Sequence, residues 1–335
     1  MPPDMPDMKQ KIAEVLKNTS PMGTLIVLLF VIVFFILYYI YSVVKKRDYN
    51  CKVISSYPIK AMEPLSNEVL NTPLNKTFIK TAYNCCCTGD FKNDYVDTCA
   101  LMNCAKQGVR ALDFTIYSLK GQPVIAASTL DSKKYKEMYN SLPFSKTMSQ
   151  VKQMFMYDTA NCSNVTDPLF LIFRIQSSNL LIYNKIEDTL QSIFGYGNAS
   201  GDKIYKGTTL EREKISALQE KVIILVDLTG LTNFEGSNLA LITALPFGTI
   251  TNQIYRESDA YDLLDTGVNP NEDNVNILYP DFATKSSNYD FDTVGLKQQF
   301  QFIGMNFQMN DIYLDAYNGY FKSAIIKQPP KNNML

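Results

Sequence analysis

Cysteines are the residues whose type and spacing come closest to a chemical site in this chain of 335 residues. Five of the seven fall within twenty residues: Cys85, Cys86, Cys87, Cys99 and Cys104. Such a cluster can form one or two disulfides, hold zinc through thiolates, or remain as buried free thiols. The cluster has no Cys-x2-Cys pair, so zinc fits the spacing least well, and we assign no metal to it.

The pairing of these cysteines depends on the compartment. Adjacent cysteines usually pair with distant partners, because a disulfide needs Cα atoms about 5.5 Å apart and Cβ atoms that face each other. In an extracytosolic domain we expect disulfides from the loop 85–87 to Cys99 or Cys104, with Cys51 and Cys162 more distant. On a reducing side we expect free thiols.

Carboxylates are concentrated between Glu257 and Asp273, where oxygen ligands for a cation could come together. The other members of this stretch are Asp259, Asp262, Asp265 and Glu272. The stretch lacks the regular alternation and the central glycine of a calcium-binding loop. We therefore predict a solvated acidic surface.

Histidine is absent from the chain. This absence excludes His-ligated zinc, Ser-His-Asp triads and Cys-His dyads, so any catalysis must use carboxylates, lysine, tyrosine or thiols. The 32 lysines and arginines nearly balance the 33 acidic residues, and the net charge of −1 gives no reason to propose a nucleic-acid partner. No cofactor is expected.

The elements that position these residues are apolar runs alternating with amphipathic segments, which begin near residue 73. The runs that predict strands are VRALDFTIY (109–117), PVIAAS (123–128), LFLIFRI (169–175), KVIILVD (221–227) and QFIGMNF (301–307). Helical spacing of apolar residues occurs around 147–157, 179–194 and 208–219. Several runs are apolar on both faces, which indicates a parallel sheet covered by helices, either a barrel or a doubly wound sheet.

The first fifty residues differ from the rest of the chain. Thr24 to Val44 carry no charge and are long enough as a helix to cross about 30 Å of hydrocarbon. We predict an N-terminal tail at 1–22, a single transmembrane helix at 23–44, a linker at 45–72, a folded domain at 73–330 and a C-terminal tail at 331–335. An extended linker of about twenty-five residues reaches on the order of 80 Å.

The sequence leaves the orientation in the membrane open. Basic residues flank the span on both sides: Lys9, Lys11 and Lys17 before it, and Lys45, Lys46 and Arg47 after it. This distribution leans only slightly toward a cytosolic C-terminal domain. Four glycosylation sequons beyond the span point the other way, at Asn75, Asn161, Asn164 and Asn198.

Two sets of motifs between residues 73 and 330 carry a family resemblance. The first set is FIKTAYN (78–84), GVRALDF (108–114), GQPVIAAST (121–129), PFSKTMSQVKQMF (143–155) and LFLIFRI (169–175). The second set is ILYPDFATKSSNYDFD (277–292), FQFIGMNFQMND (300–311) and GYFKSAIIKQP (319–329). In order and spacing they resemble the two halves of the catalytic barrel of phosphoinositide-specific phospholipase C. The resemblance implies an α/β fold, a distorted (β/α)8 TIM barrel whose site lies at the C-terminal ends of the strands.

The resemblance also implies which residues occupy the catalytic positions. Members of this family cleave inositol lipids with two histidines and a calcium ion. The histidine positions correspond to Tyr83 and Ala127, so we predict no catalytic residue. The calcium-ligand positions correspond to Asn84, Asp113, Thr115 and Gln176. Calcium takes about six to eight oxygens, and a single carboxylate with two amides would bind it weakly.

The headgroup-binding positions show the same loss. Where the family places cations for ring phosphates, the corresponding residues are Leu225, Asp227 and Ile277, and Arg256 falls at a serine position. Tyr279 is the aromatic remnant of the headgroup pocket. The resemblance therefore implies a pocket with few groups that hold phosphate.

We interpret the chain as a single-pass membrane protein whose phospholipase C-like barrel has lost its chemistry and acts as a structural tether. Its expected partners are the lipid bilayer and other proteins of the same assembly. A virion of a large DNA virus, in which an outer shell is joined to an internal membrane, is one setting that fits. The alternatives are a phosphodiesterase that uses non-histidine chemistry and a module that binds phosphoinositides or other anions.

Overall fold

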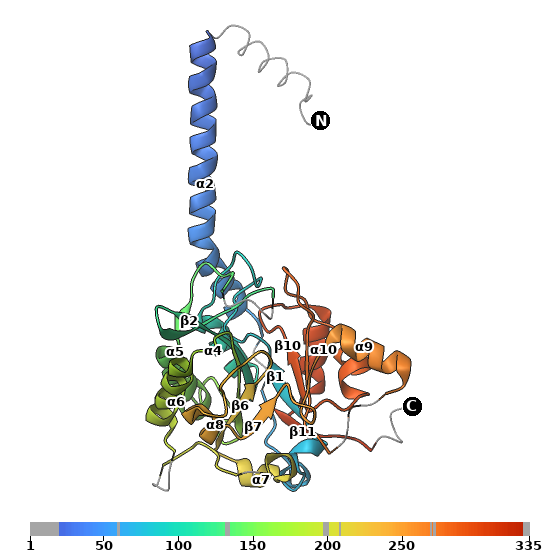
Figure 1. Cartoon of the computed structure of the whole chain (residues 1–335). Helices are drawn as coiled ribbons and strands as arrows, with labels where there is room; N and C mark the ends of the chain where they lie inside the picture. Colours follow the sequence, from blue (N-terminus) through green and yellow to red (C-terminus); the bar gives the residue numbers. More distant parts are fainter. Residues whose placement is uncertain are drawn as a thin grey trace, which may run out of the picture. The chain divides into compact units, whose positions relative to one another are not determined.

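The computed structural model describes residues 20–58, 61–130, 135–196, 201–207, 209–268, 270 and 273–330 (Figure 1). The chain divides into two compact units, Met1–Tyr49 and Asn50–Leu335. The sequons and carboxylates considered above lie in the described part, except Asn198 and Glu272.

The helix α2 (Pro21–Ser55) contains the predicted span. It is long and apolar enough to cross a membrane, and no second helix of that kind occurs among the described residues. The helix continues beyond Val44, so the first part of the predicted linker is helical.

Residues 50–58 belong to the second unit and pack on it. Ile54 is buried, and the hydroxyl of Tyr57 donates to the carbonyl of Gln308 at 2.9 Å. Gln107 Nε2 donates to the carbonyl of Pro58 at 2.9 Å. The expectation of an extended linker is therefore wrong for these residues, because their side chains and carbonyls find partners on the folded domain.

Parallel strands form the centre of the second unit, in the order β7-β6-β5-β2-β1-β10-β9-β8. Their bounds are β1 (Thr77–Ala82), β2 (Ala111–Leu119), β5 (Leu169–Ile175), β6 (Val222–Asp227), β7 (Leu245–Phe247), β8 (Ile254–Arg256), β9 (Ile277–Tyr279) and β10 (Phe302–Met305). In the described part, β7 and β8 do not pair, so the barrel is nearly closed. The predicted parallel barrel is confirmed, and the doubly wound alternative is not.

Three further strands extend this sheet in the antiparallel direction. β3 (Gln122–Ala126) pairs with β2 and with β4 (Leu142–Pro143), while β11 (Ile325–Lys327) pairs with β1. The predicted strand at 123–128 therefore forms a hairpin with β2 and is not one of the parallel barrel strands. A short turn at Gly121 connects β2 directly to β3, which leaves no room for a crossover helix.

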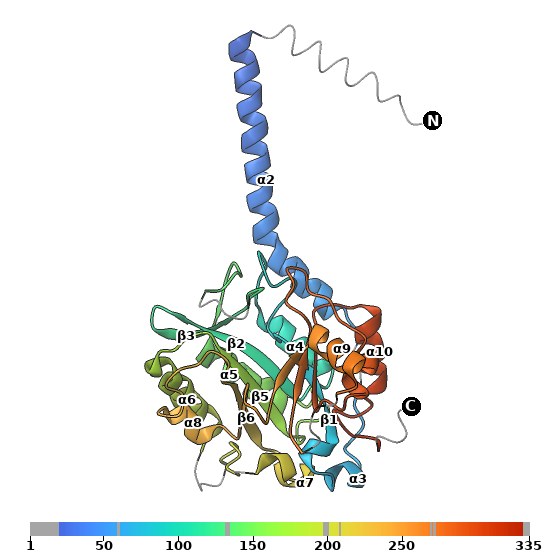
Figure 2. The same ribbon diagram turned by 45° about the vertical axis from the view of Figure 1, so that its right-hand side comes forward.

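Helices surround the strands, with α5, α6 and α8 on one side and α9 and α10 on the other (Figures 1 and 2). Their bounds are α3 (Asn67–Leu70), α4 (Thr98–Lys106), α5 (Phe144–Lys152), α6 (Leu180–Phe194), α7 (Ile215–Leu218), α8 (Asn238–Ile242), α9 (Glu257–Thr266) and α10 (Ile312–Tyr320). Single helical turns occur at η1 (Leu74–Lys76) and η3 (Leu210–Arg212), and π-helical turns at η2 (Gln153–Tyr157) and η4 (Asp292–Leu296).

The predicted helix at 208–219 is reduced to two short turns, η3 and α7. Its backbone bonds elsewhere: Leu74 N donates to Glu213 O at 2.9 Å, and Ile215 N donates to Thr72 O at 3.1 Å. These bonds to the segment before β1 replace the i to i−4 bonds that a continuous helix would need.

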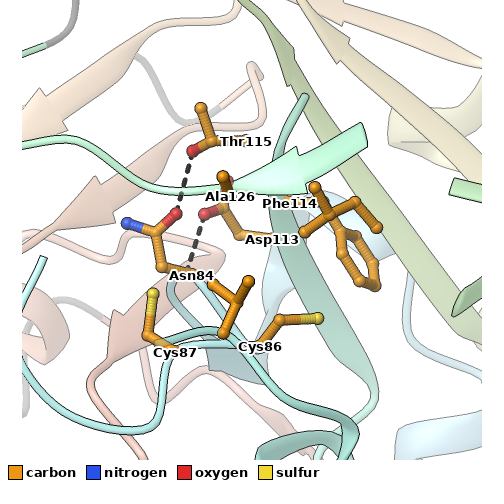
Figure 3. Close-up of a pocket in the computed structure, with 9 residues that line it drawn as sticks. Asn84, Cys86, Cys87, Asp113, Phe114, Thr115 and Ala126 are labelled. Atoms are coloured by element: carbon orange, nitrogen blue, oxygen red, sulfur yellow. Dashed lines mark hydrogen bonds between the residues drawn. The ribbon is translucent and has the colours of Figure 1, made fainter. Parts of the chain in front are cut away.

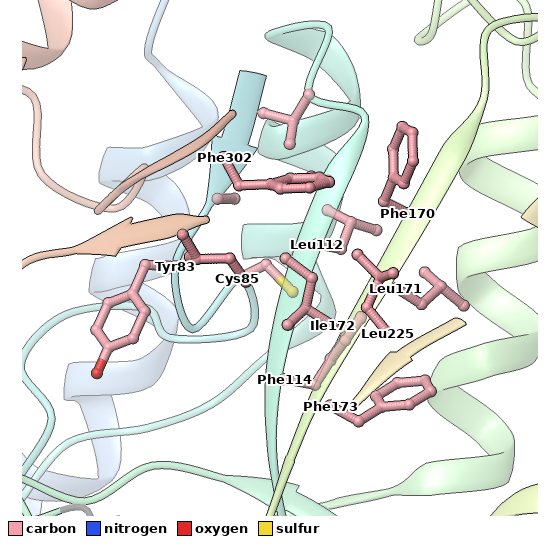
Figure 4. Close-up of a cluster of buried hydrophobic side chains, with 14 of the residues drawn as sticks. Tyr83, Cys85, Leu112, Phe114, Phe170, Leu171, Ile172, Phe173, Leu225 and Phe302 are labelled. Carbon is pink, nitrogen blue, oxygen red and sulfur yellow. The ribbon is translucent and has the colours of Figure 1, made fainter. Parts of the chain in front are cut away.

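Large aromatic side chains fill the barrel interior (Figure 4). The ring of Phe302 lies 5.3 Å from that of Phe170 and 6.2 Å from that of Phe247, both edge to face. Gly304 on β10 makes room for Tyr279, because a Cβ at this glycine would lie 2.6 Å from Cδ1 of the tyrosine. The close approach brings the Tyr279 ring into the C-terminal end of the barrel.

Candidate functional site

Polar side chains gather where the parallel strands end. Asn84 is the second residue after β1, Asp113 lies on β2, and Arg174 is the penultimate residue of β5. Arg256 and Tyr279 are the last residues of β8 and β9 and pair with each other in register. The C-terminal ends of parallel strands share one rim, so five elements distant in sequence supply a single site.

The carboxylate of Asp113 is the centre of this site and is fully buried. Its Oδ1 accepts hydrogen bonds from Arg174 Nε at 2.8 Å and from the Tyr279 hydroxyl at 2.9 Å. Its Oδ2 accepts from Arg174 Nη2 at 2.8 Å and from the backbone N–H of Asn84 at 2.9 Å. Burial and the negative charge of Asp113 raise the pKa of Tyr279, so this phenol stays protonated and donates.

The amide oxygen of Asn84 is occupied in the same way. It accepts from Thr115 Oγ1 at 2.8 Å, as Figure 3 shows, and from Arg174 Nη2 at 2.8 Å. The left-handed backbone of Asn84, with φ of 45°, turns its N–H toward Asp113. Three of the predicted ligand positions therefore do meet, but they meet around a guanidinium.

Gln176, the fourth predicted ligand position, does not join them. It follows the end of β5, and its backbone N–H donates to Ile116 O at 2.7 Å. Arg174, two residues earlier, pairs in register with Thr115 and reaches the site instead. The sequence offered one signal for it, because Arg174 is the only charged residue in the apolar run LFLIFRI.

Tyr83, at the first histidine position, lies between two arginines. The Cζ atom of Arg174 lies 4.7 Å from the centre of its ring and that of Arg256 lies 5.4 Å away. Arg256 Nη1 donates to the Tyr83 hydroxyl at 3.1 Å. The Tyr279 ring lies 4.7 Å from the Tyr83 ring, and Phe282 covers Arg256 at 3.6 Å. The arrangement is a buried cation–π stack.

Ala127, at the second histidine position, is buried and bonds to the backbone of Glu137. Glu137 N donates to Ala127 O at 3.0 Å, and the Glu137 carboxylate accepts from Ser128 and from the backbone and hydroxyl of Thr129. Lys92 forms an ion pair with it at 3.0 Å. Burial would raise the pKa of Glu137, but these hydrogen bonds outweigh burial and lower it to about 2. The carboxylate is therefore ionised and fully engaged at neutral pH.

The cysteines pair differently from the expectation. Cys99 forms a disulfide with Cys51, while Cys85, Cys86, Cys87 and Cys104 are buried free thiols, as is Cys162. The reason is geometric: Cys104 lies on the buried face of α4, whereas Cys99, near the start of α4, reaches the end of α2. Asp97 lies close to this disulfide, but sulfurs bonded to each other are not free to ligate a metal.

The buried thiols are poorly suited to chemistry. Burial raises the pKa values of Cys85, Cys87 and Cys104, so all three stay protonated at neutral pH. A protonated thiol is a weak nucleophile and a weak metal ligand. Cys86 and Cys87 also line a small pocket with Asn84 and Asp113 (Figure 3).

The remaining headgroup positions carry no cation. Leu225 and Ile277 are buried in β6 and β9, and Asp227 accepts from Thr229 N at 2.8 Å. The first part of the acidic stretch, Glu257–Thr266, forms α9. Asp259 caps this helix by accepting a hydrogen bond from Arg256 N at 2.8 Å.

Comparison with solved structures identifies the architecture. PLC21 from L. pealei superposes with a TM-score of 0.60 at 16% identity over 78% of this chain, and PLC21 from S. officinalis with 0.60 at 17% identity over 78%. The barrel has the phospholipase C fold. A calcium-dependent phosphoinositol-specific phospholipase C from Pseudomonas sp. has a TM-score of 0.50 at 10% identity, covering 78% of this chain and 98% of its own.

The phospholipase C fold is thus shared at low sequence identity. This chain covers 38% of the L. pealei protein and 37% of the S. officinalis protein. No protein-family model matches the sequence, and no curated protein matches it. The likeness establishes the barrel and leaves its chemistry to be argued from the site.

Proposed function

We propose that this chain is a catalytically inactive, membrane-anchored barrel of the phospholipase C type that tethers other proteins to a bilayer. The observation that carries the proposal is the guanidinium of Arg174, which binds both oxygens of Asp113 and the amide oxygen of Asn84. The positive charge of Arg174 thus occupies the oxygens that would otherwise be available to a metal cation.

The residues do not fit a calcium ion. Calcium takes about six to eight oxygens, with carboxylates setting the affinity. Among the described residues, Asp113 supplies the one carboxylate at the former calcium-ligand positions. Its four hydrogen bonds leave no oxygen lone pair directed at a cation. Binding calcium would require the displacement of Arg174, because the ion would otherwise be buried beside a second positive charge.

Proton transfer lacks a carrier as well. The Tyr83 hydroxyl accepts a hydrogen bond from Arg256, and Ala127 offers only a methyl group. Loss of one general acid or base typically lowers a rate by roughly 10²–10⁴-fold, and both positions are changed here. These losses support a structural role for the barrel.

The anchor supplies the other half of the proposal. The long apolar helix α2 suits a single span, and the barrel that follows it is large enough to present extensive surface to other proteins. A virion whose shell is joined to an internal membrane is one setting for such a tether. Purified particles of the source that lack this chain would exclude that setting.

The decisive test is a turnover assay on the full-length chain in detergent micelles. Inositol lipids and glycerophosphodiesters are offered with millimolar calcium, and release of inositol phosphate or glycerol phosphate is measured. We expect no release above that of a heat-unfolded sample. Calcium-stimulated release that disappears in Asp113→Asn but persists in the exposed control Glu235→Gln would overturn the proposal. Thermal stabilisation by inositol phosphates would favour an anion-binding module instead.

A further inference from the structure

The helices α9 and α10 lie near each other (Figures 1 and 2). Both expose apolar or aromatic side chains. Ile312 is 76% exposed, Tyr261 40%, Tyr313 39% and Tyr320 36%. We call these four side chains and the carboxylates of α9, η4 and α10 the acidic aromatic face. Clustered exposed apolar groups of this kind mark interaction surfaces more often than isolated ones do.

The members of this face lie close together although they come from three elements. Burial, the carboxylates of Glu257 and Asp290 and the neighbouring phenol of Tyr313 all raise the pKa of Tyr261. The Tyr320 ring lies 5.8 Å from that of Phe291, next to η4. α9, η4 and α10 therefore contribute to one continuous patch.

The segment that contains α9, η4 and most of the exposed side chains of this face carries a strong negative charge. Residues 257–315 contain eleven acidic residues and two lysines, whereas the whole chain has 33 acidic and 32 basic residues. The rest of the chain is consequently net positive. A strongly negative patch on a nearly neutral protein produces a local potential that attracts cationic partners and repels anionic ones.

Some of these carboxylates accept hydrogen bonds inside the fold, and others face solvent. Asp259 and Asp311 cap α9 and α10. Asp262, Asp265 and Asp315 are exposed and make no ion pair within the part of the chain that the structure describes. Like charges on adjacent helices repel one another, so this arrangement costs stability unless a partner neutralises it.

We propose that the acidic aromatic face docks a lysine- and arginine-rich segment of a partner protein. Carboxylates pair with the cations, while the tyrosine rings offer cation–π contacts and the large, rigid contact area typical of interface centres. The same charge excludes anionic lipid surfaces and nucleic acid as occupants. The inference deepens the proposed tethering function by stating the chemistry of its partner.

The test measures binding of fluorescent deca-arginine to the full-length chain in neutral phosphatidylcholine nanodiscs at physiological salt. We expect saturable binding that weakens at least tenfold in the triple variant Asp262→Lys, Asp265→Lys, Asp315→Lys. The matched control Glu63→Lys, Asp188→Lys, Glu235→Lys makes the same charge change at exposed sites elsewhere, and we expect less than a twofold effect. Ile312→Ala with Tyr313→Ala should weaken binding about threefold or more, because the apolar contact is lost.

Several outcomes would overturn this inference. These are no binding by the native chain, equal weakening in both triple variants, or preferential binding of deca-glutamate or phosphatidylserine vesicles. Self-association that the Asp262, Asp265 and Asp315 reversals abolish would make the partner a second copy of this chain. The peptide assay requires no turnover, so its result is independent of the test for catalytic inactivity.

Discussion

Removing the Arg174 guanidinium should both destabilise the barrel and expose a cation position. Arg174→Met leaves the fully buried carboxylate of Asp113 without its cation and removes three charge-assisted hydrogen bonds. Breaking one partner of a buried ion pair typically costs about 3–5 kcal/mol. We expect a loss of this size in the free energy of unfolding, and a similar loss for Asp113→Asn, which leaves the guanidinium alone.

The double variant Arg174→Met, Asp113→Asn removes both charges together. It keeps acceptors and donors of similar shape for Tyr279 and Asn84, so we expect it to be more stable than the sum of the single losses by about 3 kcal/mol. Urea unfolding in detergent micelles gives these values, followed by circular dichroism and tyrosine fluorescence because the chain has no tryptophan. Arg212→Met, at an exposed position, is the control and should change little.

Calcium provides the second measurement on the same variants. If Arg174 replaces a cation, Arg174→Met should gain thermal stability from calcium, by about 2.7 kcal/mol at a concentration of one hundred times the dissociation constant. The native chain and the double variant should not respond. Strictly additive single and double losses, together with no calcium response in Arg174→Met, would refute the interpretation of this residue as an internal cation.

Three further predictions concern the rest of the fold. Cys51→Ser with Cys99→Ser opens a ring with a sequence separation of 48, which should lower the free energy of unfolding by about 4 kcal/mol; equal urea midpoints for native and variant chains would contradict this. Burial raises the pKa of Asp167 to about 6, above its ordinary 3.8, so the folded state holds the extra proton and stability rises as pH falls from 7 toward 4. Asp167→Asn should therefore stabilise the chain by about 2 kcal/mol at pH 7.5 and by little below pH 4, which a pH series of thermal unfolding would check. Asn75 and Asn164 are buried in the fold, so peptide mapping of the folded protein should find no glycan on either, and full occupancy would contradict the fold at those positions.

The fold was predictable because its signals are local and repeated. LFLIFRI became β5 at its predicted bounds, and the two quoted sets of motifs lie in one nearly closed barrel. The resemblance, which placed Asn84, Asp113 and Thr115 at calcium-ligand positions, also implied that these three residues meet. The segment 123–128 was predicted to be a parallel strand of the barrel, but it forms a hairpin with β2. Apolar content alone does not distinguish these two arrangements.

The content of the site was less predictable. Arg174 and Gln176 lie two residues apart and project to the same face of an extended chain. The sequence does not give the register between β5 and β2, so it could not tell which of the two meets Asp113. The disulfide was missed for another reason. Several cysteine connectivities fit a given set of spacings, and the choice of Cys51 depends on α2 continuing helically to Ser55, which the proline-bearing sequence did not suggest.

The disulfide between Cys51 and Cys99 also determines how mechanical load passes through the protein. All of β1 lies between these two cysteines in the sequence, inside a covalent ring. A pull arriving along the chain from the N-terminal side therefore crosses from Cys51 to α4 and bypasses the central strand. With the ring intact, roughly 150 Å of polypeptide is shielded from extension. With the disulfide reduced, the same force would act directly on β1, and we expect the barrel to unfold by loss of this strand first.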